Sequence, residues 1–291
     1  MTGAAVTLEI PSSLHWLETL PEGRVWLEAL PATVRETAQR WNLELGQPFA
    51  DCYVSLVLPA QDRDLVVKIQ FPDRESRHEA AALSLWAGNG AVLLVDHWVE
   101  KHVLLLERCV PGTHLADVGP ATGLDVIIDL LPRLWVRATE PFGSLAAEVA
   151  TWVRNLPHEY ESAGRPFARS LLDEAIEVLT GLAGSQGEQV LIHQDLHGDN
   201  VLRSQREPWL VIDPKPLSGE REFGLSPVIR SSEFGHSRAA VLYRLDRLTD
   251  ELGLDQERAR MWAFGQAIAW GFERSRVLPR HIETARWLLD G

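Results

Sequence analysis

The stretch HQDLHGDN, residues 193–200, decides the fold of this chain. Within it Asp195 and Asn200 stand five residues apart. A second aspartate, Asp213, follows 13 residues after Asn200, directly after the apolar run 209–212. Together these residues offer one carboxylate that can orient a hydroxyl group, and an amide and a second carboxylate that can hold a magnesium ion. Phosphoryl transfer needs that set and little other side-chain chemistry.

Each of these residues also has a plainer interpretation. A lone Asp195 would more often be a turn residue, Asn200 a turn amide, and Asp213 an exposed strand end before Pro214. Their joint occurrence at this spacing favours the catalytic interpretation, in which Asp195 orients the acceptor hydroxyl in line with the γ-phosphate. Asn200 and Asp213 are then the expected Mg²⁺ ligands.

Two histidines in the same stretch raise the question of a zinc site. His193 and His197 are four residues apart, which suits a metal pair only on a helix. The segment follows an apolar run and is expected to be a loop. We therefore expect His193 to hydrogen-bond the backbone, and we expect no zinc.

A lysine and a glutamate earlier in the chain complete the donor side of the site, the part expected to bind the phosphates of the nucleotide. Lys68 ends an apolar strand, and Glu79 falls on one helical face with Leu83 and Trp86. The pairing suits a lysine that grips the nucleotide phosphates and is oriented by a glutamate. The plainer alternative is a strand-end lysine that reaches solvent, and Glu75 is a rival partner.

Composition narrows the class of protein. The chain has 291 residues, 45% of them hydrophobic, and a net charge of −13. The acidic balance argues against nucleic acid or an anionic membrane surface as a partner. Two cysteines form no metal-ligand spacing, no signal peptide or membrane span is visible, and we expect a cytoplasmic protein.

The chain reads as β-rich first and helical second. Strands are expected at 53–58, 65–69, 92–99 and 103–107, with a helix at 73–86 among them. Helices are expected at 21–41 (one or two, with Pro31 in a first turn), 123–138, 144–156, 167–182, 238–252 and 255–275, and one strand pair at 200–203 and 209–212. We expect an α+β fold of two lobes. The N-terminal lobe, residues 1–111, is expected to bind the nucleotide, and the helical C-terminal lobe, residues 112–291, is expected to carry the catalytic loop, the metal ligands and the acceptor pocket.

Several phrases resemble one known family. The pieces VVKI, HEAAAL, LLLERCVPG, HQDLHGDNVL and WLVIDPKPLSGE occur in the order found in aminoglycoside phosphotransferases. More narrowly, the chain resembles the branch of streptomycin 6-kinases and hydroxyurea-resistance kinases, with a proline after Asp213 where protein kinases have phenylalanine. The resemblance runs from about residue 14 to the last helices.

The resemblance implies a bilobal protein-kinase-like fold with a small β-rich N-lobe and a larger helical C-lobe. It implies ATP or GTP as donor, with the base bound by the backbone of Glu107, Arg108 and Val110. It also implies Lys68 on the phosphates, Asp195 as catalytic base, and Asn200 and Asp213 as Mg²⁺ ligands. The phosphate-covering segment 46–51 departs from the pattern, because it has one glycine and no G-x-G-x-x-G cradle.

The acceptor is expected beside Asp195, against the helical lobe. An acidic and aromatic wall would suit a small cationic molecule, by ion pairing and cation–π contact. Each glutamate could equally be a solvated surface charge, and Trp262 is expected in the core. The role of Lys215 is open between stabilising phosphate charge and pairing with Asp213. The candidates for the wall are Glu220, Glu222, Glu233, Trp270 and Glu273.

Three functions remain open on the sequence alone. The first is an antibiotic O-phosphotransferase that transfers the γ-phosphate to an aminoglycoside such as streptomycin and so confers resistance. The second keeps the chemistry with another small hydroxylated metabolite or antibiotic. The third is a nucleotide-binding pseudokinase module, which the missing glycines favour and the intact Asp195, Asn200, Asp213 and Lys68 oppose.

Overall fold

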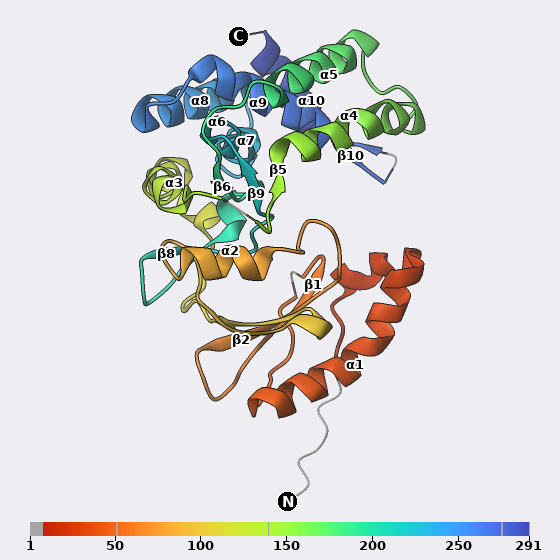
Figure 1. The fold of residues 1–291 in the computed structure, drawn as a ribbon, viewed down its shortest axis with the longest axis vertical. Helices are drawn as coiled ribbons and strands as arrows, with labels where there is room; N and C mark the ends of the chain where they lie inside the picture. Colours follow the sequence, from red (N-terminus) through yellow and green to blue (C-terminus); the bar gives the residue numbers. More distant parts are fainter. Residues whose placement is uncertain (1–7, 51, 139, 275, 291) are drawn as a thin grey trace, which may run out of the picture.

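The first part of the chain builds an antiparallel sheet that carries Lys68 (Figure 1). The computed structural model describes residues 8–50, 52–138, 140–274 and 276–290. The sheet has the strand order β1 (Ser55–Pro59), β2 (Leu65–Gln70), β4 (Val103–Glu107) and β3 (Leu94–Trp98). The other elements of this part are η1 (Ser12–Thr19), α1 (Pro21–Trp41), α2 (Glu79–Trp86) and η2 (Val99–Lys101).

Strand β4 takes part in two hydrophobic cores. Because side chains alternate between the faces of a strand, Val103 and Leu105 join a small core with η1 and α1. Leu104 and Leu106 point the other way, into a large core that includes α2 and most of the helical part. Helix α2 is also fixed to that part by the Trp86 indole, which donates to the carbonyl of Leu134 at 2.9 Å.

The remainder of the chain is mainly helical. The helices stack above the sheet, so that α1 and α10 lie toward opposite ends of the molecule (Figure 1). The helical elements are η3 (Leu115–Val118), α3 (Pro120–Leu134), α4 (Leu145–Ser162), α5 (Arg169–Ala183), η4 (Gly198–Asn200), α6 (Arg221–Gly224), α7 (Ser226–Arg230), α8 (Arg238–Leu252), α9 (Gln256–Ala269) and α10 (Pro279–Leu289).

Short strands hold the predicted catalytic stretch against both parts of the molecule. A three-stranded sheet has the order β5 (Gly143–Ser144), β9 (Leu217–Gly219), β6 (Val190–Ile192). A separate hairpin pairs β7 (Val201–Arg203) with β8 (Trp209–Val211). In β8 the backbone of Val211 exchanges hydrogen bonds with Gly90 and Val92, which follow α2, at 2.9 and 3.0 Å. This contact fixes the end of β8, and hence Asp213, relative to α2.

The predicted helix at 73–86 is wrong at its beginning. The helix starts only at Glu79, and the preceding residues form turns. Asp73, the first residue of the predicted range, accepts a hydrogen bond on its carboxylate from the N–H of Ser76 at 2.7 Å. Glu79 therefore lies in the first turn of α2, with a fully buried side chain.

The predicted helix at 255–275 is wrong at its end. Helix α9 stops at Ala269, and the chain then forms a hairpin of β10 (Phe272–Glu273) and β11 (Arg276–Val277). Trp262 is fully buried, as predicted. Pro31 lies inside the single helix α1 and not in a first turn.

Two simpler features agree with the sequence. Among the described residues neither cysteine forms a disulfide bond: Cys52 is buried and Cys109 partly buried. Among the described residues, no helix combines the length and the apolar character needed to cross a membrane.

Candidate active site

The loop after β6 presents Asp195 from a fixed backbone. His193 begins the loop, and its Nε2 lies 2.9 Å from the carbonyl oxygen of Ile212. Its ring stacks on Trp86 of α2, with ring centroids 6.4 Å apart. Burial lowers the pKa of His193 to about 4, so the ring is neutral near pH 7. The predicted role of His193, a backbone hydrogen bond in a loop, is confirmed.

Two residues of the site adopt a strained backbone. Gln194, just before the predicted base, has φ +62°, and Asp213 has φ +54°. Non-glycine residues rarely occupy this left-handed region, and such strain concentrates at functional sites. Gln194 is held there in part by Gln266 of α9, whose Nε2 donates to the Gln194 carbonyl at 3.3 Å.

Asp195 lies among three cationic or ionisable groups. Lys215 Nζ is 3.0 Å from Asp195 Oδ2, and Arg230 Nη2 and His197 Nε2 are each 3.9 Å from Oδ1. Burial alone would raise the pKa of Asp195, but Lys215, followed by His197 and Arg230, outweighs it and lowers the pKa to about 2. The carboxylate is therefore ionised at all physiological pH values. It is a weak base that is well suited to orienting a hydroxyl.

A buried lysine connects the sheet to α2 and to the end of β8. Lys68 Nζ donates to both carboxylate oxygens of Glu79, at 2.8 and 2.7 Å, and forms an ion pair with Asp213. Gln70 donates to Glu79 Oε2 at 2.6 Å. Burial would lower the pKa of Lys68, but Asp213 and Glu79 outweigh it and raise the pKa. The predicted pairing of Lys68 with Glu79 is confirmed, and Glu75 is not its partner.

Asn200 lies close to Asp195, and its side-chain amide contacts the protein through nitrogen rather than oxygen. Its Nδ2 donates to the Asp195 carbonyl at 2.9 Å and lies 3.2 Å from His197 Nε2. Within the described residues Asn200 Oδ1 has no hydrogen-bond partner in the protein, and the Asp213 carboxylate forms its ion pair with Lys68. An amide oxygen and a carboxylate are hard-oxygen ligands of the kind that Mg²⁺ prefers. The chemistry of these two residues thus fits a magnesium ion.

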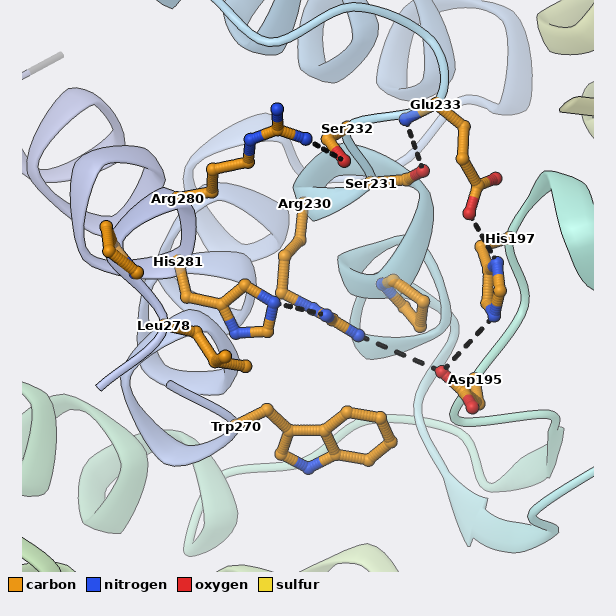
Figure 2. A pocket seen from close by; sticks show the side chains of 12 residues that line it. Asp195, His197, Arg230, Ser231, Ser232, Glu233, Trp270, Leu278, Arg280 and His281 are labelled. Atoms are coloured by element: carbon orange, nitrogen blue, oxygen red, sulfur yellow. Dashed lines mark hydrogen bonds and ion pairs between the residues drawn. The ribbon is translucent and has the colours of Figure 1, made fainter. Parts of the chain in front are cut away.

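A cavity of about 520 Å³ opens beside Asp195 (Figure 2). Asp195 and the His197–Glu233 pair lie along one side of it, and the imidazole Nδ1 is 2.7 Å from Glu233 Oε1. On the opposite side His281 contacts Arg230, whose Nη1 is 3.0 Å from His281 Nε2. The lining consists of Asp195, His197, Pro227, Arg230, Ser231, Ser232, Glu233, Trp270, Leu278, Pro279, Arg280 and His281.

The structure brings two of the five predicted acceptor residues to this cavity, Glu233 and Trp270. Glu220 is buried elsewhere: its carboxylate accepts from Arg258 Nε at 2.7 Å, from Gly187 N at 2.8 Å and from the Trp262 indole. Glu222 lies on α6, outside the cavity lining. Glu220 and Glu222 were expected in the wall as carboxylates for a cationic acceptor, but neither belongs to the cavity lining.

Glu273 is also outside the cavity, because the hairpin β10–β11 carries it to the sheet. Its Oε1 accepts from the hydroxyl of Tyr53 at 2.6 Å, and Arg274 Nη2 donates to the same hydroxyl at 3.0 Å. Arg274 also lies over the ring of Trp16 in η1, 4.5 Å from the ring centroid. These contacts join the helical part to the segment that precedes β1.

The sequence offered no signal for the basic side of the cavity. Arg230 ends the five-residue helix α7, and Arg280 and His281 begin α10 after the hairpin. An arginine or histidine at a helix end is usually a solvated residue, and only the packing of α7 and α10 against α9 brings these three to one cavity. His197 was weighed as one of a zinc pair with His193. In the structure its ring lies beside Glu233 and Asp199.

The connection after β4 was predicted to bind the nucleotide base. The backbone N–H groups of Glu107 and Arg108 are already used, donating to Leu93 and Asp64 at 3.0 and 2.9 Å. Among the described residues, those of Cys109 and Val110 have no protein acceptor, so they are free to bind a base. The Glu107 carboxylate is held by Arg206, with oxygen–nitrogen distances of 2.9 to 3.0 Å.

The segment predicted to cover the phosphates runs along β1. Gly46 and Phe49 donate backbone hydrogen bonds to Pro59 and Val57, at 2.8 and 2.9 Å. Ser13 of η1 donates to the carbonyl of Ala50 at 2.9 Å. Asp51, the last residue of this predicted segment, lies outside the described residues.

Comparison with known proteins gives a consistent result. The family model described as aminoglycoside/hydroxyurea antibiotic resistance kinase matches residues 40–275. A hydroxyurea phosphotransferase of Kitasatospora aureofaciens is 38% identical, covering 99% of this chain and 87% of that protein. A streptomycin 6-kinase of Streptomyces glaucescens is 36% identical, covering 85% of this chain and 83% of that protein.

The solved structures agree on the fold. Choline kinase LicA of Streptococcus pneumoniae has a TM-score of 0.63 at 14% identity, covering 90% of this chain and 99% of that one, and the same protein is also known in complex with AMP. This likeness confirms the predicted α+β, bilobal protein-kinase-like fold. With a matching family model over most of its length, the chain belongs to the aminoglycoside/hydroxyurea antibiotic resistance kinases.

Proposed function

We propose that this kinase transfers the γ-phosphate of a magnesium nucleotide, ATP or GTP, to a hydroxyl of an aminoglycoside such as streptomycin. The observation that carries the proposal is the position of Asp195. Its carboxylate lines the cavity, and its backbone carbonyl accepts a hydrogen bond from Asn200 Nδ2 at 2.9 Å. An acceptor hydroxyl in the cavity would meet the γ-phosphate there.

The donor side follows from the buried ion pairs. Lys68, oriented by Glu79, is the group proposed to bind the α- and β-phosphates. Mg²⁺ held by Asn200 and Asp213 would neutralise charge on the phosphates. The free N–H groups of Cys109 and Val110 favour binding of the base at residues 107–110, which includes Glu107 and Arg108.

The acceptor side has mixed charge. Glu233 supports a cationic acceptor, as does the protein's net charge of −13. The ring of Trp270 already has Lys215 and Arg230 over it, each 5.0 Å from the centroid, so we do not assign it to the binding of an acceptor cation. Asp195 itself is neutralised by Lys215, so we do not assign it to the binding of an acceptor cation. Arg230 and Arg280 lie in the same lining and would meet hydroxyl or carbonyl oxygens of the acceptor.

A direct assay tests the proposal. Purified protein is incubated with MgATP or MgGTP and streptomycin, nucleoside diphosphate release is followed, and the product is identified by mass spectrometry. Asp195→Asn, which keeps the side-chain shape, is expected to lower kcat by about 10²–10⁴-fold with unchanged circular dichroism. If Asp195→Asn turns over as fast as the wild type, the assigned mechanism is wrong.

A second acceptor class has support from the comparisons. The relative that covers 99% of the chain is a hydroxyurea phosphotransferase, so a small N-hydroxy compound is the second candidate. Hydroxyurea in the same assay separates the two. Stabilisation by magnesium nucleotide without turnover on any acceptor would instead indicate a nucleotide-binding module.

A further inference from the structure

Lys215 lies where the donor and acceptor sides of the site meet. It follows Asp213 by two residues, and its backbone N–H donates to the carbonyl of His193 at 3.1 Å. The loop that carries Asp195 and the segment that carries Asp213 are thus joined at Lys215. The sequence left open whether this lysine pairs with Asp213, and in the structure its ion pairs are with Asp195 and Glu75.

The ammonium group of Lys215 bridges two carboxylates from different parts of the molecule. Nζ lies 3.0 Å from Asp195 Oδ2 and 3.2 Å from Glu75 Oε2, and it sits over the Trp270 ring, 5.0 Å from the centroid. Glu75 precedes α2 and is 40% exposed, so water competes for it. Burial would lower the pKa of Lys215, but Asp195 and Glu75 raise it, and the lysine stays protonated.

Two cations approach different oxygens of the Asp195 carboxylate, Lys215 at Oδ2 and Arg230 at Oδ1, and both lie over the ring of Trp270. Arg230 lines the acceptor cavity and contacts His281. Lys215 is absent from that lining and reaches toward Glu75, in the part of the chain that carries α2 and the Lys68–Glu79 pair. An ammonium has three N–H donors, so Lys215 can keep its contact with Asp195 while exchanging the exposed Glu75 for another anion.

We propose that Lys215 is a catalytic residue whose ammonium leaves Glu75 and donates to an oxygen of the γ-phosphoryl group during transfer. This inference rests on the proposed function. In the step, the acceptor oxygen forms a bond to the γ-phosphorus while the bond from phosphorus to the bridging oxygen breaks. The electron pair of that bond leaves with the nucleoside diphosphate, and the hydroxyl proton passes to Asp195. Lys215 remains protonated throughout and stabilises the charge on the transferring group.

A purely positional role makes a different prediction from a catalytic one. Without Lys215 the pKa of Asp195 would rise, and the acid limb of the kcat–pH profile would move to higher pH. If Lys215 acts only through Asp195, kcat recovers to the wild-type plateau once Asp195 is ionised again. If Lys215 also contacts the phosphoryl group, the plateau itself stays low at every pH.

The experiment compares Lys215→Met and Lys215→Arg with the wild type, using MgATP and whichever of streptomycin or hydroxyurea the wild type phosphorylates. For Lys215→Met we expect a pH-independent plateau lower by about 10²–10³-fold, with MgATP affinity by calorimetry within a few-fold of the wild type. Lys215→Arg, which keeps the charge, should recover part of that loss. Glu75→Gln is the matched control, because it removes only the resting partner, and its kcat should stay within a few-fold.

The outcomes separate the two proposals. A Lys215→Met plateau equal to that of the wild type overturns the catalytic role of Lys215 and leaves the proposed function intact. A wild type that binds MgATP but phosphorylates neither acceptor instead contradicts the proposed function itself. A melting temperature of Lys215→Met with MgATP that matches the wild type excludes misfolding as the cause of a low plateau.

Discussion

Lys68 is buried and forms ion pairs with Glu79 and Asp213, so substitution of this lysine should lower the free energy of unfolding strongly. Lys68→Met leaves two carboxylates without their cation. Removal of one partner of a buried ion pair typically costs about 3–5 kcal/mol of the free energy of unfolding. We expect a loss of that size in urea denaturation, together with loss of MgATP binding.

The double variant Lys68→Met/Glu79→Gln provides the control. It removes the lysine and one of the two charges that the lysine neutralises, so it should be more stable than Lys68→Met alone. A double variant that is less stable than the single one would mean that Lys68 stabilises the fold by packing and not by charge.

His193 should make the protein's stability depend on pH. Its pKa is lowered to about 4 by burial, from an ordinary value of 6.5. The unfolded chain therefore binds a proton more readily than the folded one. The stability due to the neutral ring is complete above about pH 6.5 and is lost as the pH falls toward 4, by at most about 3 kcal/mol.

The variant His193→Gln isolates this effect. Glutamine keeps a donor for the carbonyl of Ile212 but does not titrate, so its unfolding free energy should fall less between pH 6.5 and 4 than that of the wild type. The measurement is urea denaturation at several pH values. Equal slopes for the two proteins would show that His193 is not the group responsible.

At this scale the sequence predicted the pairing of Lys68 with Glu79 but only two of the five residues expected in the acceptor wall. The residues of the catalytic loop, the buried ion pairs and the segment after β8 come together because each lies in, or close to the end of, a strand or helix whose position the fold determines. These residues are Asp195, Asn200, Asp213, Lys68 and Glu79. Arg230 and His281 could not be predicted, because their place depends on how α7 and α10 pack and not on a local pattern.

Among the elements, the turn that becomes η4 leaves no room for a side chain at Gly198. A Cβ there would lie 2.6 Å from Glu233 Oε2 and 2.8 Å from the backbone N of Ala116. Gly198→Ala must therefore displace the start of η4, which carries Asn200. We expect weaker Mg²⁺ dependence of nucleotide binding, measured by calorimetry over a Mg²⁺ titration.

Gly181 in α5 serves as the matched control. A Cβ at Gly181 would have no neighbour within 4 Å. Gly181→Ala should therefore keep wild-type Mg²⁺ dependence and gain up to about 1 kcal/mol in stability from better helix propensity. If Gly198→Ala also behaves like the wild type, the close approach at η4 has no role in placing Asn200.

The elements that the sequence predicted best are those whose hydrophobic residues recur without interruption at the spacing of a helix or a strand. Helix α8 has the predicted bounds, and the four strands of the large sheet fall where alternating or apolar runs placed them. The helical pattern was extended too far after Ala269, because Trp270 and Glu273 continue the spacing of α9 while the chain has already turned into a hairpin. Tertiary contacts of Glu273 and Arg274 with Tyr53 decide that turn.

For the whole molecule, the contacts between its two parts are spread over several places. Val211 pairs with the segment after α2, Trp86 donates to Leu134, and the hairpin β10–β11 contacts Tyr53 and Trp16. The sequence indicated two lobes with a boundary at residues 111–112, and this boundary stays a prediction. What it did not indicate is how firmly α2 is bound to the helical part.

The two-sided packing of β4 has a consequence for how the protein melts. Because Val103 and Leu105 stabilise one core and Leu104 and Leu106 the other, neither core can come apart without exposing the opposite face of the same strand. We expect one cooperative thermal transition, with equal calorimetric and van't Hoff enthalpies in scanning calorimetry. Leu105→Ala and Leu104→Ala should each shift that single transition to lower temperature, whereas two resolved transitions would show that the cores unfold as separate units.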